Sequence, residues 1–345
     1  MLQAVGQICS SNSMAHNLEQ CVKLVGQAAA AGAKILFLPE ASDYIATSAQ
    51  ESVALAQPVA TSPFVAGLRS AAAAHKLAVH VGIHVPVAVQ PSAASPSASI
   101  GRVLPAVPVP ERDAPPSTPT TTKLYNRTIY IGPDGSLLEA GAYDKLHLFD
   151  YPDAALRESA TTQAGAAFAA PFDSPVGRLG SLICFDLRFP EAALHLAASR
   201  ARDPAQVLLY PSAFTVPTGR AHWAVLLRAR AVETQSYVVA AAQVGRHNPG
   251  RSPRVSYGRS LVVDPWGRVL LQLRGVRPSS SGGGSGNRDD DDHHHADADP
   301  ESPPEYDAED GAVGQLGIVD IDLAEWHRVR TQMPLVRRTD VYPRV

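Results

Sequence analysis

Cysteine is scarce in this sequence of 345 residues, with Cys9, Cys21 and Cys184 its three representatives. An odd number of widely separated cysteines does not build a disulfide framework, so we expect reduced thiols and a cytoplasmic protein. No apolar run approaches the ~20 residues that a membrane-spanning helix requires. Because the apolar segment 4–8 follows the first methionine almost directly, we also expect no secretory leader.

Clusters of positive charge are missing as well. The chain has 30 Lys and Arg residues against 33 Asp and Glu residues, a formal net charge of −3, and no basic run interleaved with aromatic residues. This charge pattern argues against nucleic acid as a partner and favours a small neutral or anionic metabolite. Residues 126–128 match a glycosylation sequon, which we interpret as coincidental because no leader is expected.

What the sequence does contain is a large apolar fraction arranged with two periodicities. Hydrophobic residues make up 45% of the chain, enough for a sizeable core. Short apolar runs, expected as strands, alternate with segments in which apolar residues recur at helical spacing, an order typical of an α/β domain. Strands are expected at 4–8, 35–40, 77–85, 125–131, 137–147, 179–183, 207–210, 237–244, 261–263, 269–273 and 315–321, and helices at 14–29, 63–75, from 190, 222–235 and 323–330.

Two low-complexity segments interrupt this pattern. Residues 86–122 are rich in Pro, Ser, Ala and Thr, and residues 278–310 are rich in Gly, Ser, Asp and His. Neither has enough apolar surface for a core, so we interpret both as insertions, the second disordered, within a single domain spanning 1–345. The histidines 293–295 beside the aspartates 289–292 are metal-ligand types, but a solvated linker is the favoured interpretation and no metal site is predicted.

The segment 179–191 places a cysteine at a sharp structural boundary. An apolar run ends at Ile183, Cys184 follows, and Pro190 opens the next expected helix. A cysteine between a strand end and a helix start lies near backbone N–H groups that favour a thiolate and an oxyanion. Packing as a small buried hydrophobe is the competing interpretation of Cys184.

Three further charged residues stand at chemically suggestive positions. Glu40 ends a strand, Lys145 lies within Tyr-Asp-Lys-Leu-His, and Glu158 follows in Leu-Arg-Glu-Ser. A glutamate beside a thiol can take its proton, and a lysine can favour the thiolate and stabilise the oxygen that becomes negative when a carbonyl is attacked. Taken singly, each has an ordinary alternative: a helix cap for Glu40, a solvated face for Lys145 and a loop charge for Glu158.

Motifs around these residues resemble the signatures of the nitrilase, or carbon-nitrogen hydrolase, superfamily. They are Phe-Leu-Pro-Glu-Ala at 37–41, Tyr-Asp-Lys-Leu-His-Leu-Phe-Asp at 143–150 and Ile-Cys-Phe-Asp-Leu-Arg-Phe-Pro-Glu at 183–191, in the family's order, and 157–159 matches its second glutamate. Within the superfamily the chain resembles the Nit branch and, in it, the deaminated glutathione amidases. The blocks that carry this finer resemblance are 210–214, 221–223, 227–235, 240–247 and 263–267.

The resemblance implies a role for each residue. Cys184 is the nucleophile, Glu40 the general base, and Glu158 a second carboxylate that positions the lysine or the substrate. Lys145 and the backbone N–H of Phe185 are the oxyanion partners. The expected reaction is attack of the thiol on an amide carbonyl, a thioester intermediate and hydrolysis by water. It requires no metal or organic cofactor.

Four more residues are candidates near the substrate. Arg188, four residues after the nucleophile, suits an anionic substrate group because its guanidinium is planar, with a structural salt bridge as the alternative. Phe214 is expected to line the pocket, with core packing as the alternative. His147 and His222 would suit a cysteine–histidine protease, but the Cys-Gly-Ser-Cys-Trp context of that class is missing, so we interpret both as structural or supporting.

The family implies the architecture and the reaction. We expect a four-layer α-β-β-α sandwich, dimerising through its helical layer as a homodimer, that acts on a small-molecule amide without nucleic-acid or membrane partners. The expected reaction cleaves the 2-oxoglutaryl amide bond of deaminated glutathione to 2-oxoglutarate and cysteinylglycine. The first alternative is an ω-amidase acting on 2-oxoglutaramate. The second is a catalytically idle Nit-like binding protein whose insertions dock partners.

Overall fold

Two stacked β-sheets organise the chain in the computed structural model, which describes residues 1–89, 121–151, 156–197, 203–279 and 305–342. The first sheet holds the strands of both ends of the chain. Its parallel centre consists of buried apolar strands, as expected of strands covered on both faces. In spatial order its strands are β18 (Gln315–Asp320), β1 (Leu2–Gln7), β2 (Ile35–Phe37), β3 (Ala78–Val89), β4 (Thr121–Ile131) and β5 (Leu137–Asp144).

The second sheet is formed by the later half of the chain. Its three central strands run parallel, and antiparallel strands flank them on both sides. In spatial order its strands are β15 (Val269–Gln272), β14 (Leu261–Val263), β11 (Tyr237–Ala240), β10 (Val207–Leu209), β9 (Gly177–Ser181) and β8 (Phe172–Ser174).

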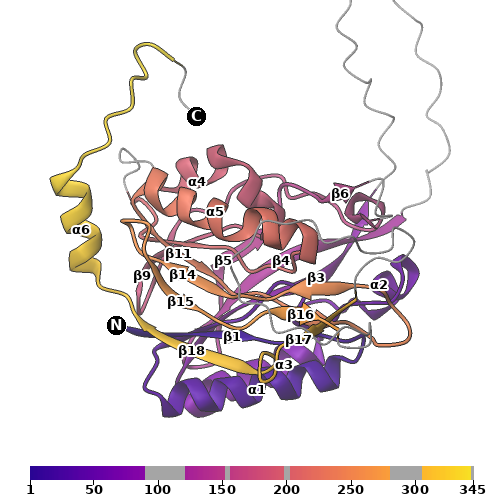
Figure 1. Ribbon diagram of the computed structural model, residues 1–345. Helices are drawn as coiled ribbons and strands as arrows, with labels where there is room; N and C mark the ends of the chain where they lie inside the picture. The colour runs from indigo at the N-terminus through magenta and orange to yellow at the C-terminus, as the bar shows by residue number, and fades with distance from the viewer. Residues whose placement is uncertain (90–120, 152–155, 198–202, 280–304, 343–345) are drawn as a thin grey trace, which may run out of the picture.

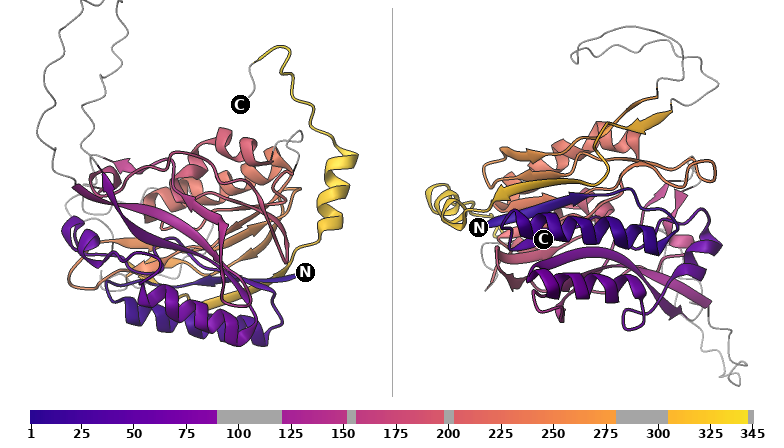
Figure 2. Two further views of the ribbon diagram at one scale, coloured as in Figure 1. Left: turned by 180° about the vertical axis from the view of Figure 1, so that it is seen from behind. Right: turned by 90° about the horizontal axis from the view of Figure 1, so that it is seen from below.

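Helices cover the outer face of each sheet, which gives four layers (Figure 1). The helices α1 (Met14–Ala30) and α3 (Pro63–His75) lie side by side on the first sheet, as the view from below shows (Figure 2). The helices α4 (Pro190–Ala197) and α5 (Val216–Thr234) cover the second. The predicted α-β-β-α sandwich is confirmed.

Three apolar layers hold the four structural layers together. One lies between α1, α3 and the first sheet and includes Cys21 and Leu24. The middle one lies between the sheets and includes Phe37 and Val207. The third joins the second sheet to α4 and α5, with Trp223 on α5. Burial of these side chains stabilises the sandwich by roughly 1.5–3 kcal/mol for each large one.

Helix starts follow local capping chemistry. The Oγ of Ser13 accepts the N–H of His16 at the start of α1, and the Oγ of Ser62 accepts that of Val65 just before Pro63 opens α3. For α5 the observed start, Val216, precedes the predicted one at 222. The cap is Thr215, which is followed by a proline within the first turn. The prediction relied on apolar spacing and missed this start signal.

The hairpin of β3 and β4 extends into the segment 86–122. Residues 86–89 pair with 121–124, so regular structure reaches beyond the predicted strand end at 85. Pro86 is tolerated because the pairing of β3 with β2 has ended at His80, which leaves β3 an edge strand there. The remainder, 90–120, lies outside the described residues.

Regular structure also enters both ends of the segment 278–310. The strand β16 (Val276–Pro278) pairs with β17 (Tyr306–Ala308), antiparallel, which closes the segment at its base. The glycine-rich, aspartate and histidine stretches within 280–304 lie outside the described residues.

Several shorter elements lie outside the two large sheets. The helix α2, which the apolar spacing did not predict, begins after a serine cap, and α6 lies beyond the sheet edge, toward the C-terminus (Figure 1). The predicted strand 237–244 is divided, because residues 241–243 leave β11 and bridge to Ser212 and Ile8. The remaining bounds are α2 (Ala49–Leu55), α6 (Leu323–Gln332), β6 (Asp150–Tyr151), β7 (Leu156–Arg157), β12 (Val244–Arg246), β13 (Val255–Tyr257) and the 3-10 helices η2 (Glu158–Ala160) and η3 (Cys184–Arg188).

Candidate active site

Four predicted residues from distant parts of the sequence meet in one cluster. Glu40 follows β2, Lys145 follows β5, Glu158 opens η2 and Cys184 opens η3. The Lys145 Nζ lies 3.0 Å from Oε1 of Glu40 and 2.8 Å from Oε2 of Glu158. The Cys184 thiol and the Glu40 carboxylate lie close enough for each to shift the pKa of the other. The ammonium of Lys145 therefore joins both carboxylates, and the Cys184 thiol is a neighbour of one of them, Glu40.

The backbone at Glu40 is held from two sides. A Cβ on Gly82 of β3 would lie 2.6 Å from the Glu40 Cα, so only glycine allows the two segments to approach this closely. The Nε2 of Gln243 donates to the carbonyl oxygens of Glu40 and Ala41, at 3.0 and 3.3 Å. Gln243 is fully buried. Sequence reasoning missed Gln243, whose contact with Glu40 spans more than 200 residues.

Ion pairing outweighs burial at Lys145 and Glu40. Burial opposes the charge on Lys145, but Glu158 and Glu40 raise its pKa well above the ordinary value. Burial likewise opposes the charge on Glu40, yet Lys145, together with hydrogen bonds from Asn126 and Cys184, holds its pKa below the ordinary value. Glu40 is thus ionised at neutral pH, as a general base must be.

The side chain of Cys184 rests as a thiol. Burial first, and then the negative charge of Glu40, raise the pKa of the Cys184 thiol, and the opposing effect of Lys145 is smaller. The sequence pattern led us to expect that nearby N–H groups and a lysine favour a thiolate; Lys145 does lower the pKa of the thiol, but burial and Glu40 outweigh it. A protonated thiol beside an ionised carboxylate is the arrangement in which a carboxylate can activate a thiol by taking its proton.

The backbone around Cys184 adopts an uncommon conformation. Its φ of 45° lies in the left-handed region, a strained conformation for a non-glycine residue that is concentrated at functional sites. Its own N–H donates to the carbonyl oxygen of Pro211 at 3.0 Å, and the N–H of Asp186 donates to that of Ile183 at 2.9 Å. The N–H of Phe185, between them, has no acceptor among the described contacts, and this suits it to an oxyanion.

Glu158 is held by more than the lysine. Its Oε2 accepts the N–H of Phe149 at 2.8 Å, and its own N–H donates to the carbonyl oxygen of Phe149 at 3.1 Å. These contacts fix the carboxylate that faces Lys145. Glu158 contacts the ammonium of Lys145, and its role in positioning the lysine stays a prediction.

Asn126 is a member of the cluster that sequence reasoning missed. It lies on β4, and its Nδ2 donates to Oε1 of Glu40 at 2.6 Å and to Oε1 of Glu158 at 3.0 Å. The sequence singled it out only as the first residue of a sequon. Because the side chain is buried and its nitrogen contacts both carboxylates, the folded protein offers no glycan acceptor there.

His147 contacts a buried aspartate. Its Nδ1 lies 2.7 Å from Oδ1 of Asp186, and its ring stacks on Phe189 with centroids 3.7 Å apart. The same Asp186 accepts the hydroxyl of Tyr143 at 2.7 Å and the N–H of Ile183 at 2.9 Å. These contacts agree with the supporting role predicted for His147.

Arg188 and Phe214 have other neighbours. Within the described part of the chain, no hydrogen bond or ion pair joins either of them to the four-residue cluster. The Nη2 of Arg188 donates to Nδ1 of His222 at 2.7 Å, and no carboxylate pairs with it among the described residues. Phe214 is buried, with its ring 4.9 Å from that of Trp223. The alternative of core packing thus describes Phe214 well.

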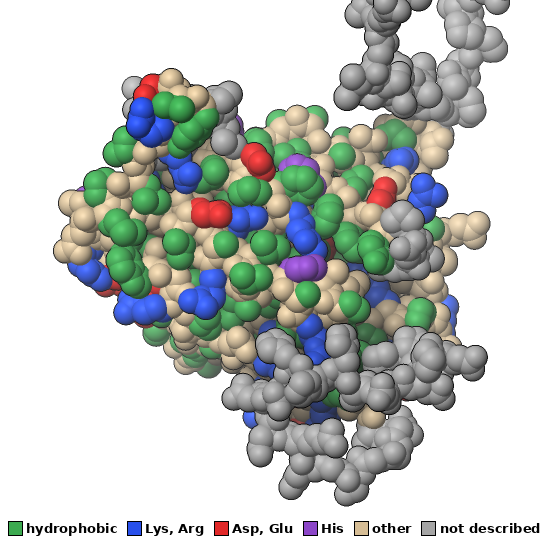
Figure 3. Space-filling view, turned by 45° about the horizontal axis from the view of Figure 1, so that its top comes forward, with side chains coloured by type: hydrophobic (Ala, Val, Ile, Leu, Met, Phe, Trp, Pro, Cys, Tyr) green, Lys and Arg blue, Asp and Glu red, His purple; other side chains and the backbone are tan. Residues whose placement is uncertain are grey.

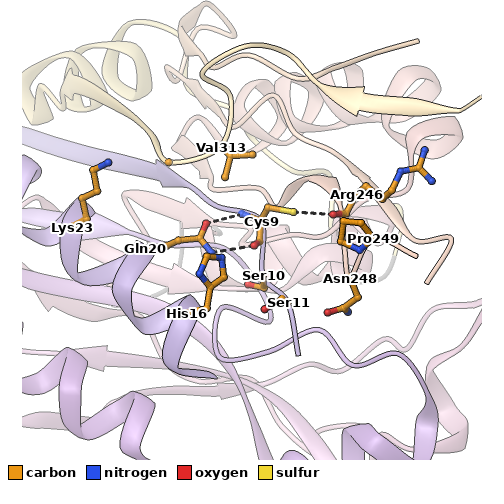
Figure 4. A pocket seen from close by; sticks show the side chains of 11 residues that line it. Cys9, Ser10, Ser11, His16, Gln20, Lys23, Arg246, Asn248, Pro249 and Val313 are labelled. Carbon is orange, nitrogen blue, oxygen red and sulfur yellow. Dashed lines mark hydrogen bonds between the residues drawn. The ribbon is translucent and has the colours of Figure 1, made fainter. Parts of the chain in front are cut away.

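A cavity of about 380 Å³ lies away from the predicted residues (Figure 4). Cys9, at its wall, donates through Sγ to the carbonyl oxygen of Arg246 at 3.4 Å, and burial raises the pKa of this thiol to about 12. A thiol held protonated in this way is a poor nucleophile. No group of three His, Cys, Asp or Glu side chains suited to a metal ion occurs in the described residues.

The fold and the cluster define a nitrilase-type hydrolase, and comparison with known proteins gives the family. The family model described as carbon-nitrogen hydrolase matches residues 2–276. The chain therefore belongs to the carbon-nitrogen hydrolase family. The predicted superfamily membership is confirmed.

Individual relatives place the chain near the Nit proteins. It is 37% identical to "Probable hydrolase nit2" of Schizosaccharomyces pombe over 100% of this chain and 99% of that protein. It is 38% identical to the deaminated glutathione amidase of Rattus norvegicus over 78% of this chain and 72% of that one. The crystal structure of the C. elegans NitFhit protein superposes with a TM-score of 0.71 and 32% identity, covering 99% of this chain and 66% of that chain. An amide-acting hydrolase of the Nit branch is thus confirmed.

No helix in the described ranges is long and apolar enough to span a bilayer.

Proposed function

We propose that this protein hydrolyses the 2-oxoglutaryl amide bond of deaminated glutathione, through a thioester on Cys184, to 2-oxoglutarate and cysteinylglycine. The observation that carries the chemistry is the cluster in which the ionised Glu40 is paired with Lys145 at 3.0 Å, and both act on the protonated Cys184 thiol. The support for this substrate is the similarity over most of the chain to a deaminated glutathione amidase.

Proton transfer and attack form the first half of the mechanism. Glu40 takes the thiol proton while the Cys184 Sγ attacks the amide carbonyl carbon. The carbonyl oxygen becomes an oxyanion that the ammonium of Lys145 and the N–H of Phe185 stabilise. As the C–N bond breaks, Glu40 returns its proton to the leaving nitrogen, and the acyl group remains on the sulfur as a thioester.

Hydrolysis of the thioester restores the enzyme. Glu40, again a carboxylate, takes a proton from water, and the resulting hydroxide attacks the thioester carbonyl at the same oxyanion position. The C–S bond breaks, the proton returns to the sulfur, and the acid leaves. The cycle consumes one water and needs no redox cofactor or metal ion.

Arg188 is the residue that we propose contacts the carboxylate of the 2-oxo acid. Its guanidinium hydrogen-bonds His222, and the pKa of His222 is lowered by burial and by Arg188 itself, so the histidine stays neutral and accepts from the arginine. This leaves the positive charge of Arg188 for an anion. We also propose that Phe214 lines the substrate pocket, because it directly follows the Tyr-Pro-Ser-Ala segment.

We further propose that the protein is a homodimer located in the cytoplasm. Large apolar side chains are exposed on and beside the second helical layer: Val225 and Val232 of α5, and Trp266 in the turn between β14 and β15. On this side, hydrophobic side chains lie between basic and histidine side chains (Figure 3). Such exposure supports association through this layer. The three free cysteines support a reducing compartment.

The deciding experiment uses Cys184→Ala with the matched control Cys21→Ala, since Cys21 is a buried core cysteine. Purified proteins are assayed with deaminated glutathione and with 2-oxoglutaramate. We expect turnover of deaminated glutathione by wild type and Cys21→Ala, and a loss of at least ~10³-fold in Cys184→Ala. Undiminished turnover in Cys184→Ala would show that the nucleophile is wrongly assigned.

The same assay separates the alternatives. A preference of about tenfold or more for 2-oxoglutaramate, which corresponds to roughly 1.4 kcal/mol, would replace the proposed substrate with that of an ω-amidase. No turnover of either amide by wild type would favour a catalytically idle binding protein.

A further inference from the structure

Asn126 lies outside the three family motifs, yet it occupies the centre of the cluster. We propose that Asn126 is a positioning residue for the reaction: its amide fixes one oxygen of Glu40 so that the other faces the thiol, and it joins Glu40 to Glu158. The inference rests on the proposed function, in which Glu40 is the base that takes the proton of Cys184.

The contacts of Asn126 duplicate those of the lysine. Both the Asn126 Nδ2 and the Lys145 Nζ reach the same two oxygens, Oε1 of Glu40 and Oε1 of Glu158. The backbone carbonyl of Asn126 also accepts the N–H of Lys145 at 2.9 Å. The asparagine therefore holds the base, the second carboxylate and the lysine segment at once.

Two donors on one oxygen leave the other free for chemistry. Oε1 of Glu40 receives Asn126 at 2.6 Å and Lys145 at 3.0 Å. Neither donor reaches Oε2. With rotation of the carboxylate fixed in this way, we infer that Oε2 is the oxygen available to the thiol, and proton transfer requires such a defined acceptor.

The orientation of the amide is set by charge. If Nδ2 and Oδ1 exchanged places, an amide oxygen would face two carboxylates. No group in the described residues donates to Oδ1, so the two carboxylates alone orient the side chain. An aspartate at 126 has the same shape but no donor, and it would add a third negative charge beside the single ammonium of Lys145.

The consequence for Glu40 concerns its ionisation. The titratable groups that face it are Lys145 after β5, Glu158 in η2 and Cys184 in η3. The hydrogen bond from Asn126 is one of the interactions that hold the pKa of Glu40 below its ordinary value. Loss of this donor raises that pKa, and an added carboxylate raises it further.

The test compares Asn126→Asp and Asn126→Ser with wild type, using Thr128→Val as the control. Thr128 lies on the same strand and is buried, and its Oγ1 has no partner in the described residues, so valine replaces it in shape without breaking a contact there. Carboxamidomethylation of Cys184 by iodoacetamide is followed by mass spectrometry from pH 3 to pH 9, alongside kcat/KM for the amide. The alkylation readout needs no physiological substrate.

We expect the acid limb of both profiles to move to higher pH, by about one unit or more in Asn126→Asp and less in Asn126→Ser, with Thr128→Val unchanged. If Asn126→Asp does not fold, the limb in Asn126→Ser decides. A limb unmoved in the folded variants, even with slower rates, would overturn the inference and leave a structural role. A shifted alkylation limb in a protein that hydrolyses neither amide would retain the inference and reject the proposed substrate.

Discussion

At the scale of single residues, the chemistry depends on which group holds the proton at rest. Glu40 is ionised because Lys145 and the hydrogen bonds to its carboxylate outweigh the effect of burial. Cys184 is protonated because burial and the negative charge of Glu40 outweigh the effect of Lys145. In the proposed mechanism the thiol therefore becomes nucleophilic only as Glu40 accepts its proton. In this proposal the reactivity of the site comes from the Cys184 thiol and the Glu40 carboxylate acting together, and not from a stable thiolate.

Glu40→Gln tests this arrangement. The amide of glutamine cannot take the proton, so we expect kcat to fall by about 10²–10⁴-fold, while Glu139→Gln, an exposed control on β5, stays at the wild-type value.

The same variant tests the pH dependence of stability. Because the pKa of Glu40 in the folded protein is lowered, its ionisation stabilises the fold above the ordinary carboxyl pKa, and this contribution is lost as pH falls through the lowered pKa. Urea unfolding should show less acid destabilisation in Glu40→Gln; equal acid sensitivity would contradict the ion pair.

At the scale of elements, a buried aspartate holds η3 against the end of β5. Asp186 is fully buried and accepts from Tyr143 and from the N–H groups of Ile183 and His147, at 2.7, 2.9 and 3.0 Å. Ile183 precedes the nucleophile, whereas Tyr143 and His147 flank Lys145. The carboxylate of Asp186 thus holds η3, which begins at Cys184, next to the segment that contains Lys145.

Asp186→Asn keeps the shape and one acceptor oxygen but removes the charge. We expect unfolding free energy to drop by about 2–4 kcal/mol, since several charge-assisted hydrogen bonds weaken together, and kcat to fall more than KM rises. Asp173→Asn, exposed on β8, is the control. Guanidinium unfolding and steady-state kinetics measure both effects. Lost stability with unchanged kcat would show that Asp186 only holds the fold.

At the scale of the whole molecule, the sandwich leaves one helical layer with exposed apolar side chains. Val225 is 60% exposed and Val232 46% exposed on α5. The buried Arg230 of the same helix donates to the carbonyl oxygen of Leu187 in η3 at 2.7 Å. The helix α5, on which the dimer surface is proposed, is therefore hydrogen-bonded directly to η3, the segment that begins at Cys184.

Val225→Glu with Val232→Glu is expected to convert a dimer into a monomer of 36.5 kDa, because two carboxylates would have to be buried in the interface. Size-exclusion chromatography with light scattering measures the mass. The control is Val313→Glu, exposed outside the helical layer. Should wild type itself run as a monomer at micromolar concentration, the dimer is wrong.

Local sequence signals determined much of the fold. Apolar runs identified nearly every strand of the two sheets, since buried strands need continuous apolar residues whatever their neighbours. The caps Ser13 and Ser62 set helix starts through contacts within three residues. The candidate cluster of Glu40, Lys145, Glu158 and Cys184 was also accessible, because each residue stands within a recognisable motif.

The tertiary structure alone decided the surroundings of that cluster and its protonation. In the sequence, Asn126 is one residue of an ordinary predicted strand. Its hydrogen bond to Glu40 joins residues that are 86 positions apart. Gln243 and Asp186 likewise act through distant partners, which no local pattern records. The protonated state of Cys184 follows from burial and from the sum of several charges, so it is a property of the assembled site. Sequence supplied the reacting groups, and packing determined how they share a proton.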